Sequence, residues 1–319
     1  MTYVLLILGF ALLIKGADFF VDGASKIAAA LKISPLLIGL TIVAMGTSAP
    51  EATVSIVAAL EGSAGVAVGN VVGSNIFNIT FVVGLAAVIF PLTVGSETIR
   101  KEIPFTLLAS VALLILISDV SLQQMDGNYL TRSDGFILLL FFAVFLYYIF
   151  EVARKDRKNT QNTEKPSTEK AKWGKNTLLT VGGLAAIIFG GELVVNNATE
   201  LAISFGMSET LVGLTIVAIG TSLPELITSV TAAIKKENEI ALGNIVGSNI
   251  FNIFFVLGLS SSISPFAIEG TIIIDILLLI VITLILLVFS RTNYKVGKVE
   301  GGLLAVIYIA YMVYIIIRN

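Results

Sequence analysis

The chain has 319 residues, of which 56% are hydrophobic and only 13% are charged, and its net charge is −2. A soluble globular domain carries roughly 25% charged residues, so this composition excludes a soluble protein and indicates a polytopic membrane protein. The chain has no Cys and no His, which excludes disulfides, thiolate metal ligands and imidazole groups as ligands or proton relays.

Apolar runs long enough to cross a bilayer follow one another along the chain. A helix needs about 20 residues to cross a hydrocarbon core of about 30 Å, and the runs lack the strict alternation of barrel strands. We therefore predict an all-α polytopic membrane protein with ten transmembrane helices, at 3–22, 33–60, 66–92, 102–119, 133–153, 176–196, 207–233, 239–263, 270–290 and 300–317.

The basic residues are distributed unevenly over the connections between these helices. If the connections alternate between two sides, one side receives 17 of the 20 Lys and Arg residues, eight of them in the polar segment 154–175. The positive-inside rule makes this side cytoplasmic. We therefore expect a multi-pass protein of the plasma or inner membrane, with both termini outside and 154–175 as a solvated cytoplasmic linker.

The two sides of this linker carry the same sequence twice. TIVAMGTSAPE begins at Thr41 and TIVAIGTSLPE at Thr215, an offset of 174 residues. The same offset relates GNVVGSNIFNI at Gly69 to GNIVGSNIFNI at Gly243. Near-identical polar sequence within apolar helices indicates a duplication that does more than maintain packing.

The duplication predicts how the halves are arranged. Residues 1–153 and 176–319 each contain five predicted helices. A unit with an odd number of spans, duplicated in tandem, must insert its second copy upside down. Inverted repeats are typical of secondary transporters, whose binding site lies at the midplane between the copies.

Glu51 and Glu225 are the two carboxylates that lie near the centres of predicted helices. An ionisable residue at that depth costs several kcal/mol or more, faces the interior of the bundle and marks an ion or substrate pathway by default. The alternative interpretation is that each Glu is only hydrogen-bonded within the bundle. We expect the two carboxylates to form one site.

Each Glu follows a helix breaker. Pro50 and Pro224 lack an N–H group and crowd the carbonyl group four residues earlier, on Gly46 and Gly220. We therefore expect both GTS-x-PE blocks to open the backbone and to turn carbonyl oxygens inward, which is tolerated at membrane depth only in a buried or wet cavity.

The third and eighth predicted helices carry further polar groups. Ser74 and Asn78 are four residues apart, as are Ser248 and Asn252, so each pair lies on one helical face. Such groups could form interhelical hydrogen bonds or bind an ion. A stripe of glycines at the same spacing is interpreted as helix packing: Gly65, Gly69 and Gly73.

The candidate ligands are all oxygens, which suits a hard cation and disfavours copper or zinc. Ca²⁺ accepts six to eight oxygens with flexible geometry, whereas Mg²⁺ tends to keep its waters. Two carboxylates balance one Ca²⁺ or two Na⁺. The same shell therefore suits either load but not both together, which is what antiport requires.

The GTS-x-PE and GN-x-VGSN-x-FNI blocks closely resemble the paired alpha repeats of the cation/calcium antiporter superfamily, and within it the Na⁺/Ca²⁺ exchangers. The resemblance covers essentially all ten predicted helices. It implies two inverted five-helix repeats, four ion positions in a central cluster, and first and sixth helices that slide across the core to alternate access.

The resemblance also implies the ion ligands, position by position. The first repeat would supply the carbonyls of Ala44 and Thr47 and the side chains of Ser48, Glu51, Ser74 and Asn78. The second would supply Ala218, Thr221, Ser222, Glu225, Ser248 and Asn252 in the matching places. Ca²⁺ would be shared mainly by the two Glu and two Thr residues, and Na⁺ would use the Ser and Ala oxygens on either side.

The resemblance favours Na⁺-driven Ca²⁺ export over two related activities. K⁺-dependent exchangers carry Asp where this chain has Asn252. Proton-coupled Ca²⁺ exchangers usually carry an acidic residue soon after the Gly-Asn pair, where this chain has VVGSN. Both remain alternatives to Na⁺/Ca²⁺ exchange.

Two other classes of protein fit these residues less well. A Ca²⁺-permeable channel has no need of inverted halves, and an intramembrane hydrolase would need a His or Lys base close to its serine. We therefore expect a transporter and not an enzyme, with Ca²⁺ and Na⁺ as transported ions, no cofactor, the lipid bilayer as its surroundings, no nucleic-acid partner, and function as a monomer.

Overall fold

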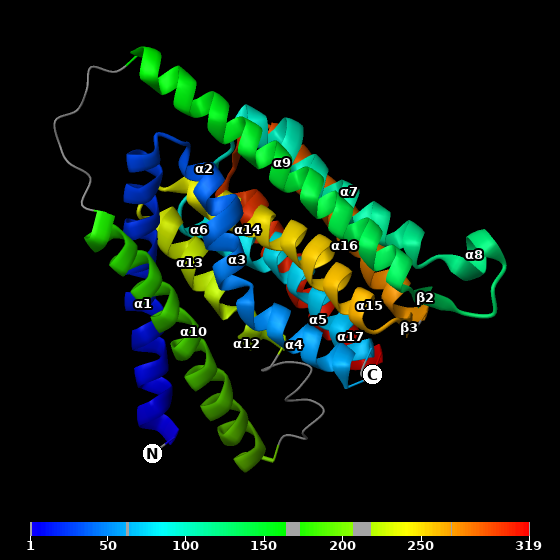
Figure 1. Ribbon diagram of the computed structural model, residues 1–319. Helices are drawn as coiled ribbons and strands as arrows, with labels where there is room; N and C mark the ends of the chain where they lie inside the picture. Colours follow the sequence, from blue (N-terminus) through cyan, green and yellow to red (C-terminus); the bar gives the residue numbers. More distant parts are fainter. Residues whose placement is uncertain (1, 62–63, 164–172, 207–217, 269, 319) are drawn as a thin grey trace.

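The computed structural model describes residues 2–61, 64–163, 173–206, 218–268 and 270–318 (Figure 1). Within these residues, seven helices are long and apolar enough to cross a membrane, and one bent pair makes an eighth span. The prediction of an all-α membrane protein agrees with this arrangement.

The first half contains five spans, three of which are interrupted by π-helical stretches labelled η. The first and second spans are α1 (Thr2–Leu31) and the series α2 (Pro35–Ile38), η1 (Gly39–Val43), α3 (Ala44–Thr47) and α4 (Ala49–Leu60). The third to fifth are α5 (Ala64–Phe77), η2 (Asn78–Val82) and α6 (Val83–Ile89); η3 (Thr98–Glu102) and α7 (Ile103–Leu116); and α9 (Arg132–Thr163).

The second half repeats this order. Its spans are α10 (Trp173–Ser204); α12 (Ala218–Thr221) and α13 (Leu223–Ile234); α14 (Asn238–Ile250), η5 (Phe251–Leu257) and α15 (Gly258–Ile263); α16 (Gly270–Arg291); and α17 (Lys298–Arg318). The first part of the predicted helix 207–233 lies outside the described residues, as does 164–172 of the predicted linker.

Three helices extend beyond their predicted bounds. The first helix continues from 22 to Leu31, the fifth from 153 to Thr163, and α10 runs from Trp173 to Ser204. Hydropathy ends a predicted span where charges begin, but good helix formers such as Ala, Lys and Arg continue a helix into water. The start of segment 154–175 is therefore helical rather than a loop.

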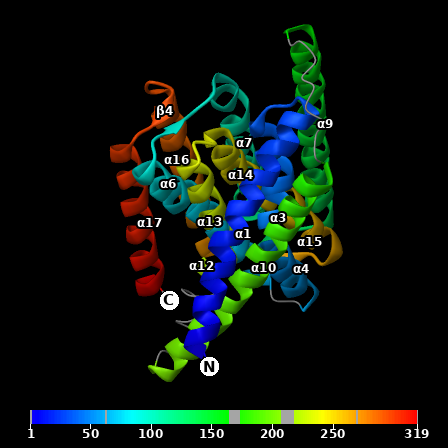
Figure 2. The ribbon, with the colours of Figure 1, turned by 90° about the vertical axis from the view of Figure 1, so that its left-hand side faces the viewer.

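The helices α1 and α10 lie side by side along one flank of the bundle (Figure 2). Glycines bring their backbones together, because a Cβ atom on Gly9 would lie 2.9 Å from the Gly190 carbonyl oxygen, and one on Gly16 would lie 2.9 Å from that of Gly183. Small residues permit this close approach in a membrane, where helices associate by packing rather than by the hydrophobic effect.

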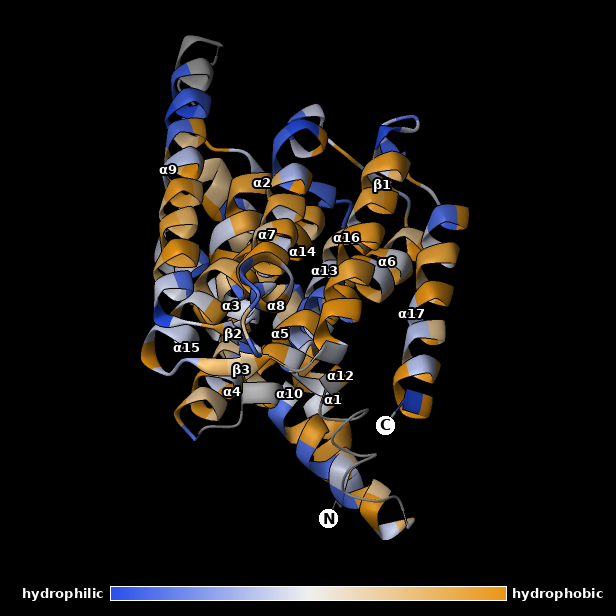
Figure 3. Cartoon of the chain, turned by 90° about the vertical axis from the view of Figure 1, so that its right-hand side faces the viewer, coloured by the Kyte–Doolittle hydropathy of each residue, from blue (hydrophilic) through white to orange (hydrophobic). Residues whose placement is uncertain are grey.

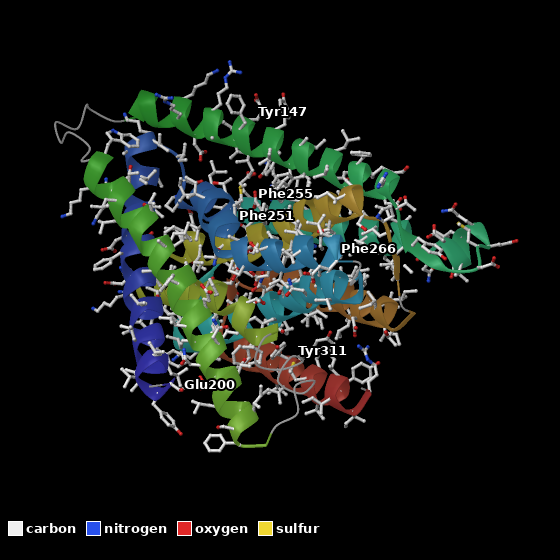
Figure 4. All side chains as sticks on the ribbon, turned by 60° about the horizontal axis from the view of Figure 1, so that its bottom comes forward. Tyr147, Glu200, Phe251, Phe255, Phe266 and Tyr311 are labelled. Carbon is white, nitrogen blue, oxygen red and sulfur yellow. The ribbon has the colours of Figure 1, made fainter. Side chains whose placement is uncertain are left out.

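The third and eighth spans form the core. In the most apolar stretch of the span 66–89, 72% is buried inside the protein, and in that of 238–263 the share is 94%. The corresponding share is only 22% in α9 and in α17. Figure 4 shows Phe251 and Phe255 of η5 between the core and α9, where both rings contact Phe142. Tyr147 lies on the outer side of α9 and is exposed. The outer helices thus present their apolar faces to lipid.

The glycines of the second half that match the predicted stripe pack closely against the second span. A Cβ atom on Gly243 or Gly247 of α14 would lie 2.6 or 2.7 Å from a carbonyl oxygen of the second span. At the matching Gly69 and Gly73 of α5, no atom of the described residues would lie within 4 Å. At the 174-residue offset, the residues that match the partners of Gly243 and Gly247 are 210 and 214, which lie outside the described residues. The packing interpretation of Gly69 and Gly73 therefore stays a prediction.

Two small antiparallel strand pairs, which the sequence did not predict, join the halves. The strand β1 (Leu92–Thr93) pairs with β4 (Lys295–Val296), and β2 (Asn128–Leu130) pairs with β3 (Phe266–Ile268). Each pair joins the end of the third span of one half to the connection between the fourth and fifth spans of the other half. Figure 3 shows the pairs at opposite ends of the bundle, as inverted repeats require. The short helix α8 (Asp119–Gln123) precedes β2.

The contact between α6 and α17 provides a test of the packing. A Cβ atom on Gly301 would lie 2.7 Å from the Gly84 carbonyl oxygen and 2.8 Å from the Ala87 Cβ, whereas one on the adjacent Gly302 would meet no atom of the described residues within 4 Å. We expect Gly301→Ala to lower the stability of the purified protein by about 1–3 kcal/mol through overpacking. The matched control Gly302→Ala should leave it unchanged or raise it by up to about 1 kcal/mol. Thermal unfolding in detergent measures both, and equal melting temperatures would contradict this packing.

Candidate functional site

The two GTS-x-PE blocks break their helices at the serine. The second span bends by 49° between α3 and α4, and Ser48, with φ −82° and ψ 10°, is the residue between them. Ser222, with φ −92° and ψ 7°, separates α12 from α13 in the same way. Pro50 and Pro224 fall in the first turn of the new helix, where a missing N–H group leaves no hydrogen bond unmade. The predicted breaks are present.

Each break places its glutamate in the first turn of a new helix. Glu51 lies in the first turn of α4 and Glu225 in the first turn of α13. The amino end of a helix carries a partial positive charge that favours a carboxylate. Both side chains are 0% exposed, so this local field and the hydrogen bonds around them offset part of the cost of burying the two carboxyl groups.

The serines at the breaks bond to the glutamate of the opposite repeat. Ser48 Oγ donates to Glu225 Oε1 at 2.7 Å, and Ser222 Oγ donates to Glu51 Oε1 at 2.8 Å. The two bonds are related by the 174-residue offset. The inverted halves therefore meet at these carboxylates, as the sequence predicts.

The predicted serines and the first threonine surround this pair. Ser74 Oγ lies 3.0 Å from Ser222 Oγ, and Ser248 Oγ lies 3.4 Å from Glu225 Oε1. Ser248 Oγ also lies 3.4 Å from the Ala44 carbonyl oxygen. Thr47 Oγ1 lies 3.3 Å from the same carbonyl oxygen and 3.0 Å from the Asn244 side-chain oxygen.

Two predicted residues of the second repeat are placed less fully. Ala218 and Thr221 begin and end α12, which puts their backbone beside the break at Ser222, but the side chain of Ala218 lies outside the described part of the chain. The carbonyl roles implied for both residues stay predictions.

Asn78 and Asn252 lie at π-helical stretches, as the first residue of η2 and the second of η5. Asn78 Nδ2 donates to Asn249 Oδ1 at 3.1 Å, and Asn252 Nδ2 donates to Asn75 Oδ1 at 3.2 Å. A π-helical turn inserts an extra residue and is frequently found at functional sites. Both amides are fully buried.

Four buried oxygens at the centre have no hydrogen-bond partner among the described residues. They are Glu51 Oε2, Glu225 Oε2, Asn78 Oδ1 and Asn252 Oδ1. A buried polar atom without a partner costs free energy and needs an explanation. The alternative that each Glu is only hydrogen-bonded within the bundle accounts for one oxygen of each carboxylate and leaves the other unpaired.

These oxygens fit a hard cation. They comprise two carboxylate and two amide oxygens, with hydroxyl groups and the Ala44 carbonyl close by, which is the donor set that Ca²⁺ and Na⁺ accept. The part of the chain that the structure describes holds no group of three or more His, Cys, Asp or Glu residues suited to a metal. The site thus relies on two charges and several neutral oxygens.

Sequence reasoning missed two pairs of asparagines. Asn70 Nδ2 donates to the Glu51 carbonyl oxygen at 3.2 Å, and Asn244 Nδ2 lies 3.4 Å from the Glu225 carbonyl oxygen. Each of these two asparagines therefore braces the helical turn that carries a glutamate. Asn75 and Asn249 bond to the predicted ligands Asn78 and Asn252. The signal was available, since all four asparagines fall in the duplicated block at the 174-residue offset.

A family model described as "Sodium/calcium exchanger protein" matches residues 1–151 and 175–317. The chain belongs to this family. It is 41% identical to the putative antiporter CaxA of Alkalimonas amylolytica over 312 residues, which are 97% of this chain and 96% of CaxA. It is 33% identical to the sodium/calcium exchanger MaX1 of Methanosarcina acetivorans, with 98% of this chain and 97% of MaX1 covered.

The fold agrees with that of a solved member of the family. A structure of the sodium-calcium exchanger NCX_Mj, soaked with zero Na⁺ and Ca²⁺, matches with a TM-score of 0.82 and 30% identity over 98% of each chain. The predicted architecture of ten transmembrane helices in two inverted repeats is thereby confirmed. Membership of this family makes the protein a multi-pass membrane transporter that exchanges Ca²⁺ against another cation.

The unpaired oxygens predict an effect of ions on stability. A cation that binds the folded protein alone stabilises it by about 2.7 kcal/mol at a hundredfold excess over its dissociation constant. We expect Ca²⁺ to raise the melting temperature of the ion-free protein, and Mg²⁺ to raise it less because Mg²⁺ dehydrates reluctantly. The shift should vanish in Glu51→Gln and Glu225→Gln. An equal Ca²⁺ shift in these variants would place the bound ion elsewhere.

Proposed function

We propose that this protein is a Na⁺/Ca²⁺ antiporter that exports Ca²⁺ by alternating access, driven by the Na⁺ gradient. The observation that carries the proposal is the pair of crossed serine–glutamate bonds, which leaves one unpaired oxygen on each of two fully buried carboxylates. The name of the relative MaX1 supports Na⁺ as the coupling ion.

Charge explains why the two ions exclude one another at this site. Glu51 and Glu225 together supply two negative charges, and the remaining oxygens within their network are neutral. One Ca²⁺ or two Na⁺ balance those charges, whereas both loads together would leave an excess positive charge in a low-dielectric interior, where charge imbalance is costly. Exchange at a common site follows.

The proposed ligands divide between the two ions. Ca²⁺ is shared by both Glu residues with the carbonyl oxygens of Thr47 and Thr221. Na⁺ uses the hydroxyl and carbonyl oxygens on either side: Ser48, Ser222, Ser74, Ser248, Ala44 and Ala218. Asn78 and Asn252 complete the centre through their side-chain oxygens. Both glutamates belong to one chain, so we propose that the monomer is sufficient for transport.

Transport by the purified protein in liposomes tests the proposal. We expect ⁴⁵Ca²⁺ uptake into Na⁺-loaded vesicles diluted into Na⁺-free medium, and none when the Na⁺ gradient is absent. Glu51→Gln or Glu225→Gln should reduce the rate by about a hundredfold or more, since even changes outside the ligand shell of a metal site cost about 10–100-fold.

The matched control is Glu102→Gln. Glu102 is also a buried carboxylate, but it lies on η3, where it accepts a hydrogen bond from the Tyr148 hydroxyl group. Normal exchange in the Glu51 and Glu225 variants would overturn the site. Uptake that requires K⁺ together with Ca²⁺, or that follows a pH gradient without Na⁺, would assign the protein to another coupling mode. Single-channel currents without Na⁺ coupling would overturn exchange altogether.

We further propose that the protein lies in the plasma or inner membrane with both termini outside. Both termini lie at one end of the bundle, and the basic end of α9 lies at the other (Figure 3). The chain has no Cys, so single cysteines can report the orientation. An impermeant maleimide should label Asp126→Cys in intact cells, and Lys158→Cys only after permeabilisation. The reverse pattern would invert the orientation and the direction of export.

A further inference from the structure

Four buried asparagines form a symmetric cluster between the third and eighth spans. Asn75 and Asn78 come from α5 and η2, and Asn249 and Asn252 come from α14 and η5. The 174-residue offset relates the two pairs. All four side chains are 0% exposed, so their amide groups have only one another and the neighbouring backbone as partners, apart from a bound ion.

Backbone carbonyl oxygens fix the orientation of the first two amides. Asn75 Nδ2 lies 3.1 Å from the Asn249 carbonyl oxygen, and Asn249 Nδ2 lies 3.4 Å from the Asn75 carbonyl oxygen. A carbonyl oxygen accepts hydrogen bonds and never donates one. The NH₂ group of each amide must therefore face the opposite backbone, because a flipped amide would set two oxygens against each other.

The fixed orientation passes to the next pair of side chains. With its NH₂ group committed to the backbone, Asn75 presents Oδ1 to Asn252, whose Nδ2 lies 3.2 Å away. Asn249 presents Oδ1 to Asn78 Nδ2 at 3.1 Å. Asn252 Oδ1 and Asn78 Oδ1 are thereby turned away from the cluster, and these are two of the four unpaired buried oxygens.

We propose that Asn75 and Asn249 are positioning residues that hold the ligand oxygens of Asn252 and Asn78 toward the transported cation. The inference rests on the proposed function, because it concerns the same ion site. An amide free to flip would present an NH₂ group to the cation for part of the time, and its partial positive charge would repel the ion. An amide offers a donor and an acceptor on one planar group, which suits Asn to positions 75 and 249.

The same logic limits which residue position 252 accepts. An aspartate there would set a carboxylate oxygen against Asn75 Oδ1, unless Asn75 gave up its bond to the Asn249 backbone. The orientation of Asn75 therefore favours a neutral amide at 252 and keeps the site at two formal carboxylates. In this way Asn75 contributes to ion selectivity without contacting the ion.

Calorimetric titration of the purified full-length protein with Ca²⁺ tests the inference without relying on transport. We expect Asn75→Ala to raise the Ca²⁺ dissociation constant by about 10–100-fold, the usual effect of removing a group that orients a metal ligand. Asn249→Ala should act alike through Asn78. The matched control is Asn197→Ala, another buried amide that donates to a backbone carbonyl group, on α10. It should bind Ca²⁺ as the unaltered protein does.

A double-mutant cycle distinguishes positioning from general damage to the fold. If Asn75 acts through Asn252, the Asn75→Ala/Asn252→Ala variant should bind Ca²⁺ as Asn252→Ala does, because the oriented group is already gone. Losses that multiply would overturn the inference, as would unchanged affinity in Asn75→Ala and Asn249→Ala. If one of these variants does not fold, the cycle of Asn249 with Asn78 decides. Failure of the proposed function looks different. In that case the unaltered protein would not bind Ca²⁺, or the Glu51 and Glu225 variants would bind Ca²⁺ no more weakly than the unaltered protein does.

Discussion

The structure depends on two crossed hydrogen bonds, Ser48 to Glu225 and Ser222 to Glu51, at its buried centre. A carboxylate removed from water needs compensating partners. Each one here receives a hydroxyl group from the opposite repeat and the amino end of its own helix. This compensation is incomplete by one oxygen per carboxylate, so the centre can persist without an ion and still bind one. A two-fold relation between the halves lets the same two residues of each half serve one another in this way.

The remaining contacts hold the two halves around this centre. The third and eighth spans form its walls, and the strand pairs β1–β4 and β2–β3 tie each half to the other at opposite ends. Buried acidic groups also join the fourth span to the fifth in each half, through Glu102 with Tyr148 and through Asp275 with Arg318, the latter by two bonds of 3.0 and 3.1 Å.

The sequence predicted the parts of the site that stand out against an apolar background. A carboxylate or a Gly-Thr-Ser-x-Pro-Glu break in the middle of a membrane helix has no common structural use, and its repetition at a fixed offset identified the pair Glu51 and Glu225. Helix ends were predicted less well, because hydropathy reports the edge of the membrane and not the last hydrogen-bonded turn. That is why α1 ends at Leu31 and α9 at Thr163 rather than at 22 and 153.

Other features depend on three-dimensional pairing that no local pattern expresses. The strands are two or three residues long and owe their existence to partners in the other half. Helical periodicity alone puts Asn75 and Asn78 on neighbouring faces, but it cannot show which amide atom faces which partner. That choice is made by the carbonyl oxygens of a helix 174 residues away along the chain. Orientation at this site is a tertiary property.

The two halves differ at their ends although they match at the centre. Lys235, after α13, lies 2.7 Å from Asp18 and 2.6 Å from Asp22 of α1. Partial burial works against the charge of this lysine, but the hydrogen bonds to Asp18 and Asp22 outweigh it and raise its pKa. At the 174-residue offset the matching residues are Glu61 and Glu192, both acidic and exposed, so the second copy cannot form the same ion pair. The centre must offer a cation the same shell from both sides, whereas the two ends face different solutions and different interfacial charge. Symmetry is therefore required of the site, and the ends of the helices are free to diverge.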